Sequence, residues 1–210
     1  MSASCCQQKP AFDGTSRAYR RVLWIVIALN AAMFLVEMVA GHAASSQALK
    51  ADALDFLADA LTYGLSLAVI GQSLRRRSQA AMLKGVSLSV MGVWVLGSTA
   101  WQVLVLGMPR AEIMGSIAVL ALATNLASVL LLLRWRDGDA NVRSVWLCSR
   151  NDAIGNVAVM LAALGVWGSG SGWPDIAVAA IMAGLFLTSS VKILRQAWSE
   201  HGSGRLVAAE

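Results

Sequence analysis

Charged side chains are scarce in this chain of 210 residues. Asp, Glu, Lys and Arg together make up 14% of it, whereas an ordinary soluble domain carries about 25%. Apolar residues make up 57% and come in long runs rather than in short amphipathic patches. This composition excludes a water-soluble globular domain and predicts an integral membrane protein.

Cysteine is also too rare to form a disulfide framework. Cys5 and Cys6 are adjacent in a polar N-terminal segment, and Cys148 lies inside an apolar run. The N-terminal segment has no short apolar core followed by a small-residue cleavage site. We therefore expect neither a disulfide framework nor a cleaved signal peptide.

The net charge of +5 does not indicate binding to nucleic acid. The basic residues lie between the apolar runs, which suits loops that face anionic lipid better than a stripe that follows a phosphate backbone. The expected partner is the lipid bilayer, and no nucleic acid is expected.

Six apolar runs, each near the roughly 20 residues that a spanning helix needs, divide the chain. They cover residues 23–39, 53–74, 82–106, 113–133, 145–166 and 176–194. The connections between them are short and leave no room for a separate soluble domain. We predict an all-α membrane protein, with a bundle of six transmembrane helices over residues 22–196, a cytosolic tail at 1–21 and a short cytosolic tail at 197–210.

The basic residues also predict how this bundle is oriented. Most of them flank the helix ends on one side of the membrane: Arg17, Arg20, Arg21, Arg75, Arg76, Arg77, Arg134, Arg136, Arg143, Lys192 and Arg195. The connections on the opposite side hold only Lys50 and Arg110. Because basic loops stay in the cytoplasm, both termini are predicted to be cytoplasmic.

Two of the predicted helices carry a stripe of polar side chains, since positions three and four apart share one helix face. The stripe on the second helix is Asp52, Asp55, Asp59 and Tyr63, and the stripe on the fifth is Cys148, Asp152 and Asn156. Carboxylates and a thiol at this spacing on two helices are typical of metal ligands rather than of contacts that only hold helices together.

Asp59 and Asp152 are predicted to lie near the middle of the bilayer. Each follows a flanking basic residue, Lys50 or Arg143, by nine positions, and is roughly 14 Å deeper at the helical rise. In a hydrocarbon layer about 30 Å thick this depth is close to the midplane. A carboxylate there costs about 2.5–3.5 kcal/mol, and two facing carboxylates also repel each other. A bound divalent cation removes both penalties, as do protons when no cation is bound.

Three further side chains each keep two interpretations. Glu37 on the first helix has either a functional role or only a contact with a neighbouring helix. Asp52 is nearer the outer surface, so it either serves the start of its helix or the entry of cations, or it coordinates the metal. Cys148 is either an inert buried side chain or a thiolate ligand one turn from Asp152.

The same residues resemble the cation diffusion facilitator family. Asn30, Glu37 and the stretch ADALDFLAD are similar to its first two helices, where a His or Asp is followed after three residues by Asp, here Asp55 and Asp59. VRSVWLCSRNDAIGNVAV is similar to its fifth helix, with Asp152 at the acid and Cys148 where a His usually stands. WPDIAVAAIMAGLFLTSSVKILRQA is similar to its sixth helix.

This resemblance implies a six-helix transporter, typically a homodimer, that exports a divalent metal such as zinc in exchange for protons. Asp55, Asp59 and Asp152 are then predicted metal ligands, with Cys148 as the fourth. A thiolate with carboxylates suits Zn²⁺, Cd²⁺ or Co²⁺ better than Mg²⁺. Family members usually carry a cytosolic metal-binding domain after the sixth helix, so we expect a short form without it.

We therefore predict a proton-coupled exporter of divalent cations in a bacterial inner membrane, not an enzyme, which needs no cofactor and takes the metal as its substrate. A homodimer is expected, held by small residues of the third helix (Gly85, Ser87, Ser89 and Gly92). One alternative is a sensor or assembly subunit whose acids only join helices. A second is an intramembrane enzyme of lipid metabolism, which the depth of the acids disfavours.

Overall fold

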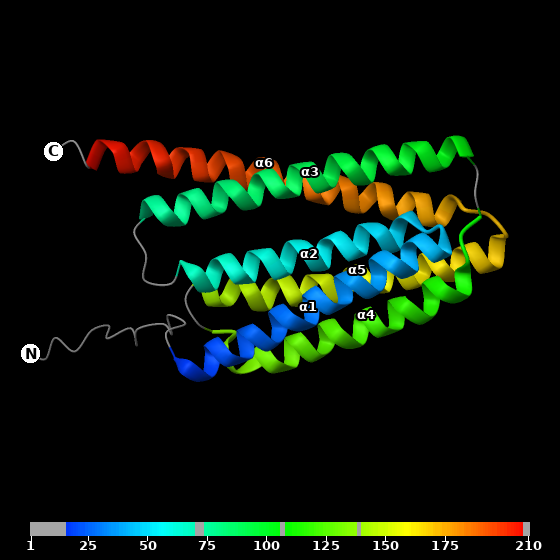
Figure 1. Cartoon of the computed structure of the whole chain (residues 1–210), viewed down its shortest axis with the longest axis horizontal. Helices are drawn as coiled ribbons and strands as arrows, with labels where there is room; N and C mark the ends of the chain where they lie inside the picture. The colour runs from blue at the N-terminus through cyan, green and yellow to red at the C-terminus, as the bar shows by residue number, and fades with distance from the viewer. Residues whose placement is uncertain (1–15, 70–73, 106–107, 138–139, 208–210) are drawn as a thin grey trace, which may run out of the picture.

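The computed structural model describes residues 16–69, 74–105, 108–137 and 140–207. Within these ranges the regular structure is helical (Figure 1). The elements are α1 (Arg17–Ala44), α2 (Gln47–Ala68), α3 (Leu74–Val105), α4 (Ala111–Leu132), the short 3₁₀ helix η1 (Leu133–Trp135), α5 (Ala140–Ser169) and α6 (Trp173–Val207). The predicted tails, 1–21 and 197–210, lie partly outside the described residues.

The helices form two groups. Helices α1, α2, α4 and α5 make a bundle, and α3 packs most extensively against α6, as the pair that runs above the bundle in Figure 1. Helix α2 contacts α1, α3, α5 and α6, so it joins the two groups. Most of its side chains are buried, and its acids are therefore held inside protein rather than against lipid.

A tight turn joins α1 to α2 and sets them antiparallel. Ser45 adopts a left-handed conformation with φ of 55°, and the Ser46 hydroxyl accepts a hydrogen bond of 3.0 Å from the Leu49 amide. Gly41 lies against α2 so closely that a β-carbon there would meet the Lys50 Cγ at 2.9 Å. This close approach brings the polar faces of α1 and α2 together.

Helix α2 begins earlier than hydropathy predicts. The span expected from the apolar run is 53–74, whereas the helix runs from Gln47 to Ala68. Its first turns carry Lys50 and Asp52, which lower the local hydropathy without ending the helix. Among the described residues, five helices are long and apolar enough to cross a membrane, and α2 is not one of them. The charged residues of α2 explain this exception.

Helices α1, α5 and α6 extend past their apolar runs at both ends, and α3 and α4 begin before theirs. Helix α6 is the longest case, because it continues to Val207 rather than ending at residue 194. Helix α1 begins and α6 ends at the same end of the molecule, which we call the Arg17 end (Figure 1). The opposite end, where α1 meets α2, is called the Ala44 end.

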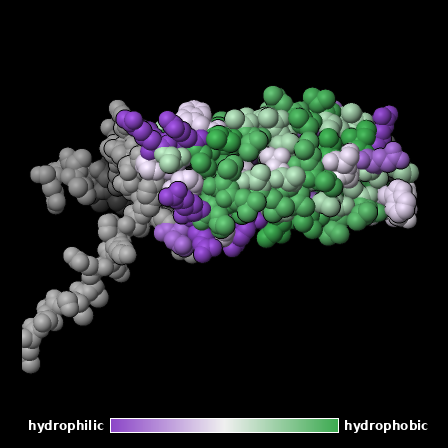
Figure 2. Space-filling model, turned by 90° about the horizontal axis from the view of Figure 1, so that it is seen from below, coloured by the Kyte–Doolittle hydropathy of each residue, from purple (hydrophilic) through white to green (hydrophobic). Residues whose placement is uncertain are grey.

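The surface matches a protein surrounded by lipid. On the face seen in Figure 2, a broad apolar band covers the middle of the molecule, with hydrophilic side chains gathered toward its ends. Large apolar side chains are exposed along α1, α3, α4, α5 and α6, including Val39, Leu104, Leu130, Leu161 and Leu185. In water such a surface would be unfavourable, so the protein is a multi-pass integral membrane protein.

Small residues of α3 are used within the chain. A β-carbon at Gly85 would meet Leu194 of α6 at 2.7 Å, and one at Gly92 would meet Leu187 at 2.9 Å. The hydroxyl groups of Ser89 and Ser190 hydrogen-bond across the same contact. Residues of α3 that were expected to hold a dimer together therefore pack against α6 of the same chain. The dimer itself stays a prediction.

Candidate metal site

A narrow hollow lies in the centre of the bundle, and all four bundle helices line it. The lining residues are Asn30 of α1, Asp52, Asp55, Phe56 and Asp59 of α2, Asn125 of α4 and Asp152 of α5. The structure thus brings together the three acids predicted as ligands from two distant parts of the chain. The hollow has no room for a water-sized sphere as it stands.

The carboxyl groups lie close to one another. Those of Asp55 and Asp59 are each within hydrogen-bonding reach of the Asp152 carboxyl group. One oxygen of Asp152 has no hydrogen-bond partner among the described residues. Three carboxyl groups at this separation cannot all be ionised without strong repulsion, so they require protons or a cation between them.

Tyr63 holds Asp59 from the Arg17 side of the hollow. Its hydroxyl group donates a hydrogen bond to the Asp59 carboxylate and lies 3.2 Å from the Ser149 hydroxyl oxygen. Tyr63 is one turn from Asp59 on α2, and Ser149 belongs to α5. This arrangement fixes the orientation of one predicted ligand by a contact between the two helices that carry the stripes.

A second pair of acids lies on the Ala44 side. Glu37 of α1 is fully buried and within hydrogen-bonding reach of Asp52 of α2. Both carboxyl oxygens of Glu37 and one of Asp52 otherwise lack hydrogen-bond partners in the described part of the chain. Because Asp52 also lines the hollow, the buried acids extend from Asp59 to Glu37, toward the Ala44 end.

Cys148 is near the acids but does not line the hollow. Its half-buried side chain packs against an apolar cluster that includes Tyr63, Leu67 and Val145. The thiol is close enough to Asp55 and Asp59 to interact electrostatically with both. Its assignment as a fourth ligand stays a prediction.

Apolar clusters pack on both sides of the hollow. On the Arg17 side the cluster is Tyr19, Leu23, Val26, Tyr63, Leu67, Leu132 and Val145. On the Ala44 side a larger cluster includes Ala48, Leu49, Met114 and Val166. Within the residues that the structure describes, no three His, Cys, Asp or Glu side chains are arranged as a preformed metal shell. Coordination of a cation by these acids would therefore require their carboxyl groups to move.

The position of α2 is fixed at its first turn by an acid from α6. The Asp175 carboxylate accepts hydrogen bonds from the Ser46 hydroxyl at 2.5 Å and from the amides of Gln47 at 2.8 Å and Ala48 at 3.0 Å. An anion is favourable there, because the first amides of a helix have no partners inside it. Asp175 therefore anchors the helix that carries most of the acids.

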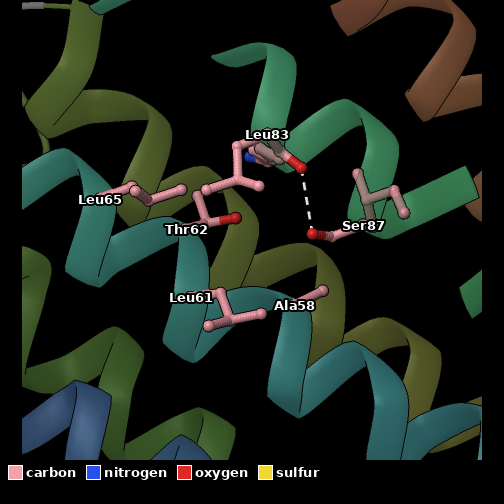
Figure 3. A pocket seen from close by; sticks show the side chains of 8 residues that line it. Ala58, Leu61, Thr62, Leu65, Leu83 and Ser87 are labelled. Carbon is pink, nitrogen blue, oxygen red and sulfur yellow. Dashed lines mark hydrogen bonds between the residues drawn. The ribbon is translucent and has the colours of Figure 1, made fainter. Parts of the chain in front are cut away.

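A cavity of about 250 Å³ separates α2 from α3 beside the site. Figure 3 shows Ala58, Leu61, Thr62 and Leu65 of α2 facing Leu83 and Ser87 of α3. Lys84 also lines this cavity and interacts electrostatically with the Asp55 and Asp59 carboxylates. Its positive charge offsets part of the repulsion among the acids.

Sequence reasoning missed several side chains that complete the site. Asn125 is a lone amide in the middle of an apolar helix, and this isolation is the one signal that could have found it. Asn30 lines the hollow as well, with its Nδ2 donating to the Val26 carbonyl at 2.8 Å. Ser149 and Asp175 gave no signal, because only the folded chain brings them to α2.

The chain matches a protein family described as "Cation efflux transmembrane domain" over residues 23–200. This segment includes every residue that lines the hollow. It begins within α1 and ends within α6, so it covers the whole bundle and the α3–α6 pair.

Three curated relatives are similar to the chain. The "Metal cation efflux system protein CzcD" of Cupriavidus metallidurans is 27% identical over 188 residues, 83% of this chain and 58% of the relative. The "Cation efflux system protein CzcD" of an Alcaligenes species is 27% identical over 181 residues, 80% of this chain and 56% of the relative. A "Cadmium, cobalt and zinc/H(+)-K(+) antiporter" of Bacillus velezensis is 23% identical over 190 residues, 84% of this chain and 61% of the relative. The chain spans about three fifths of the length of these relatives.

Proposed function

Because the chain belongs to the cation efflux transmembrane domain family, we propose that it exports a divalent metal cation across a membrane in exchange for protons. The substrate is an ion of the Zn²⁺, Cd²⁺ or Co²⁺ type. This choice is supported by the mixed set of carboxylates and a nearby thiol, and by the ions that the name of the Bacillus velezensis relative contains. The protein acts as a transporter and not as an enzyme.

The observation that carries the proposal is the meeting of Asp55, Asp59 and Asp152 at one buried hollow. These three acids lie in the interior of the bundle and form no ion pair with a basic side chain that the structure describes. The ion pair found among the described residues is between Arg136 and Asp137, away from the site. Such a cluster is costly unless a cation or protons neutralise it. We assign these acids as metal ligands, with Cys148 as the fourth.

Proton exchange follows from the same chemistry. Carboxylates and thiolates bind a metal only when deprotonated, so a cation that enters the hollow displaces protons. When the cation leaves, the acids take up protons again, which permits the return of the empty site. Protons and cation thus compete for one set of side chains.

Transport requires the hollow to open alternately to each side. Apolar clusters pack on its Arg17 side and on its Ala44 side, as expected for a closed state between two open ones. We propose that the bundle opens at one end while the other stays packed, around a fixed site near the midplane. Six spans, with the Arg17 end in the cytoplasm of a bacterial inner membrane, fit the basic residues at that end.

The test is metal-driven proton flux in liposomes that contain the purified chain. An inward or outward gradient of Zn²⁺, Cd²⁺ or Co²⁺ should drive an opposite proton flux, and Mg²⁺ should not. Asp152→Asn should abolish the flux, because it removes a ligand and a proton carrier together. Asp137→Asn is the matched control, since Asp137 is an exposed acid outside the site. Flux in the Asp152 variant equal to wild type would overturn the proposal.

The sensor or assembly subunit remains the alternative, and the same liposomes distinguish it. A sensor or assembly subunit whose acids only join helices would move no protons across the membrane when a metal gradient is applied. We also propose a homodimer, which the family resemblance implies, although Gly85, Ser89 and Gly92 of α3 pack against α6 within the chain. Crosslinking in lipid, with the monomer as the contrary outcome, tests the oligomeric state directly.

A further inference from the structure

We propose that Asn125 supplies a ligand oxygen to the transported cation and thereby favours Co²⁺, which accepts more than four ligands, over Zn²⁺. This inference rests on the function proposed above and adds a donor from α4 to the acids of α2 and α5. It concerns which ion is preferred, whereas the proposed function concerns whether a cation is carried.

The first observation is where the Asn125 side chain lies. Helix α4 is otherwise almost entirely apolar around this position, in the segment LALATNLASVLLL. The Asn125 side chain is 1% exposed and lines the hollow together with Asp55, Asp59 and Asp152. An amide at this place faces the acids rather than lipid.

The second observation is that its oxygen is unpaired. The Oδ1 atom of Asn125 is buried and has no hydrogen-bond partner among the residues that the structure describes. A buried amide oxygen without a partner is unfavourable, and native structures contain few of them. The position therefore needs a positively charged or hydrogen-donating partner.

The surroundings identify that partner as a cation. Ionised carboxylates only accept hydrogen bonds, so the neighbouring acids cannot satisfy the Asn125 oxygen once they are deprotonated for metal binding. A divalent cation between the acids can, because amide oxygens are ordinary ligands for harder ions. The oxygen is neutral, so it binds without adding charge or releasing a proton.

This extra oxygen affects the choice of metal. Zn²⁺ is almost always bound by four ligands in protein sites, and three carboxylates with one further donor already provide that number. Ions with a preference for more oxygen ligands gain most from a fifth donor. Loss of the Asn125 oxygen is therefore expected to weaken Co²⁺ binding more than Zn²⁺ binding.

Asn156 provides a matched control from the same bundle. It is also an asparagine, is fully buried, and has both of its amide atoms without partners in the described part of the chain. It lies one turn past Asp152 on α5, but it does not line the hollow. A general effect of removing a buried amide should therefore appear in both variants, and a ligand effect in only one.

The experiment measures Co²⁺ and Zn²⁺ binding to the purified full chain in detergent, with the visible spectrum of bound Co²⁺ as a report of its ligand number. Asn125→Leu keeps the shape of the side chain and removes its oxygen. We expect the Co²⁺ affinity to fall about 10- to 100-fold, with a smaller loss for Zn²⁺ and a more intense Co²⁺ spectrum as the ligand number drops. Asn156→Leu should leave the affinity ratio and the spectrum as in wild type.

Two results with the asparagine variants would overturn the inference. One is an unchanged Co²⁺ to Zn²⁺ ratio and spectrum in Asn125→Leu, while Asp59→Asn loses binding, which would leave the proposed function standing. The other is an equal change in the Asn125 and Asn156 variants. Retention of Co²⁺ binding in Asp59→Asn would reject the acid site itself and the inference with it.

Asn125→Asp keeps the test decisive if the leucine variant does not fold. The aspartate retains an oxygen at this position and adds a carboxyl group that is unfavourable in the empty site. If the side chain faces the cation, Co²⁺ should raise the melting temperature of this variant by more than it raises that of wild type. An equal rise in both proteins would contradict the inference.

Discussion

The bundle of α1, α2, α4 and α5 and the pair of α3 and α6 use polar residues in opposite ways. In the α3–α6 pair, the hydroxyl groups of Ser89 and Ser190 bond to each other, and Ser190 also donates to the Gly85 carbonyl at 2.9 Å. In the bundle, Glu37 and Asn125 are buried and carry polar atoms without hydrogen-bond donors among the described residues. Among the described residues, the α3–α6 pair leaves one buried side-chain polar atom unpaired, the Thr99 hydroxyl, whereas most such atoms lie in the bundle.

This difference separates a structural region from a functional one. Burial of unpaired polar atoms lowers the stability of a protein, so such atoms persist where a ligand completes them. The α3–α6 pair instead uses glycines and paired hydroxyls to bring two helices close together, as small residues do in membranes. Substitutions in the two regions should therefore affect different measurements.

The largest effect is expected at the centre of the bundle. Asp59→Asn should reduce metal transport by about 100-fold or more, because it removes a ligand oxygen that no neighbour replaces. Folding should not be weakened, since the amide oxygen still accepts from Tyr63 and a buried acid is removed. Transport in liposomes measures the loss of activity, and thermal unfolding without metal measures the stability of the fold. A variant that is both inactive and unfolded would contradict a purely functional role.

The pH dependence of metal binding is expected to be the next largest effect. Because the acids must lose protons to bind a cation, affinity should fall by roughly tenfold per pH unit for each proton displaced. Binding should therefore weaken from about pH 8 to pH 6, and protons should be released into an unbuffered solution on metal addition. Equilibrium binding measured across this range is the check. Affinity that is flat with pH would mean that protons do not occupy the site.

Breaking the anchor of α2 should lower stability. Asp175→Ala removes hydrogen bonds to Ser46, Gln47 and Ala48, and we expect a loss of about 1.5–3 kcal/mol in the free energy of unfolding. Asp137→Ala is the control, because that acid is exposed. Thermal or denaturant unfolding measures both. An unchanged stability in the Asp175 variant would show that α2 is held by apolar contacts alone.

The α3–α6 pair should respond to added volume rather than to lost charge. Gly92→Ala places a β-carbon 2.9 Å from Leu187, so we expect destabilisation of about 1–3 kcal/mol with unchanged metal affinity. Gly97→Ala on the same helix meets no atom within 4 Å and should be neutral or stabilising by up to about 1 kcal/mol. Equal effects at the two glycines would mean that the close contact does not limit packing.

The membrane class, the helices and the stripe on α2 could be predicted from the sequence, because hydropathy and helical spacing are local properties. Asp55, Asp59 and Asp152 could be assigned to one site, because Asp59 and Asp152 each lie nine positions after a basic residue at the end of their helix. The start of α2 was misplaced, since its capping by Asp175 depends on α6. Asn125 was missed because one amide in an apolar helix has no spacing to reveal it. The packing of Gly85 and Gly92 against α6 could not be predicted, because small residues favour close helix packing whether the partner helix belongs to the same chain or to a second copy.

The smallest effect is expected at Cys148, on the edge of the site. Its thiol is close to Asp55 and Asp59 but packs against the apolar cluster near Val145 rather than lining the hollow. If it moves in to bind the cation, Cys148→Ser should lower the preference for Cd²⁺ over Zn²⁺ by roughly three- to tenfold, because the hydroxyl keeps the volume and loses the soft donor. Cys148→His should shift the preference further toward Zn²⁺ and Co²⁺. Competition between Cd²⁺ and Zn²⁺ in transport measures this ratio, and an identical ratio in wild type and both variants would remove Cys148 from the ligand set.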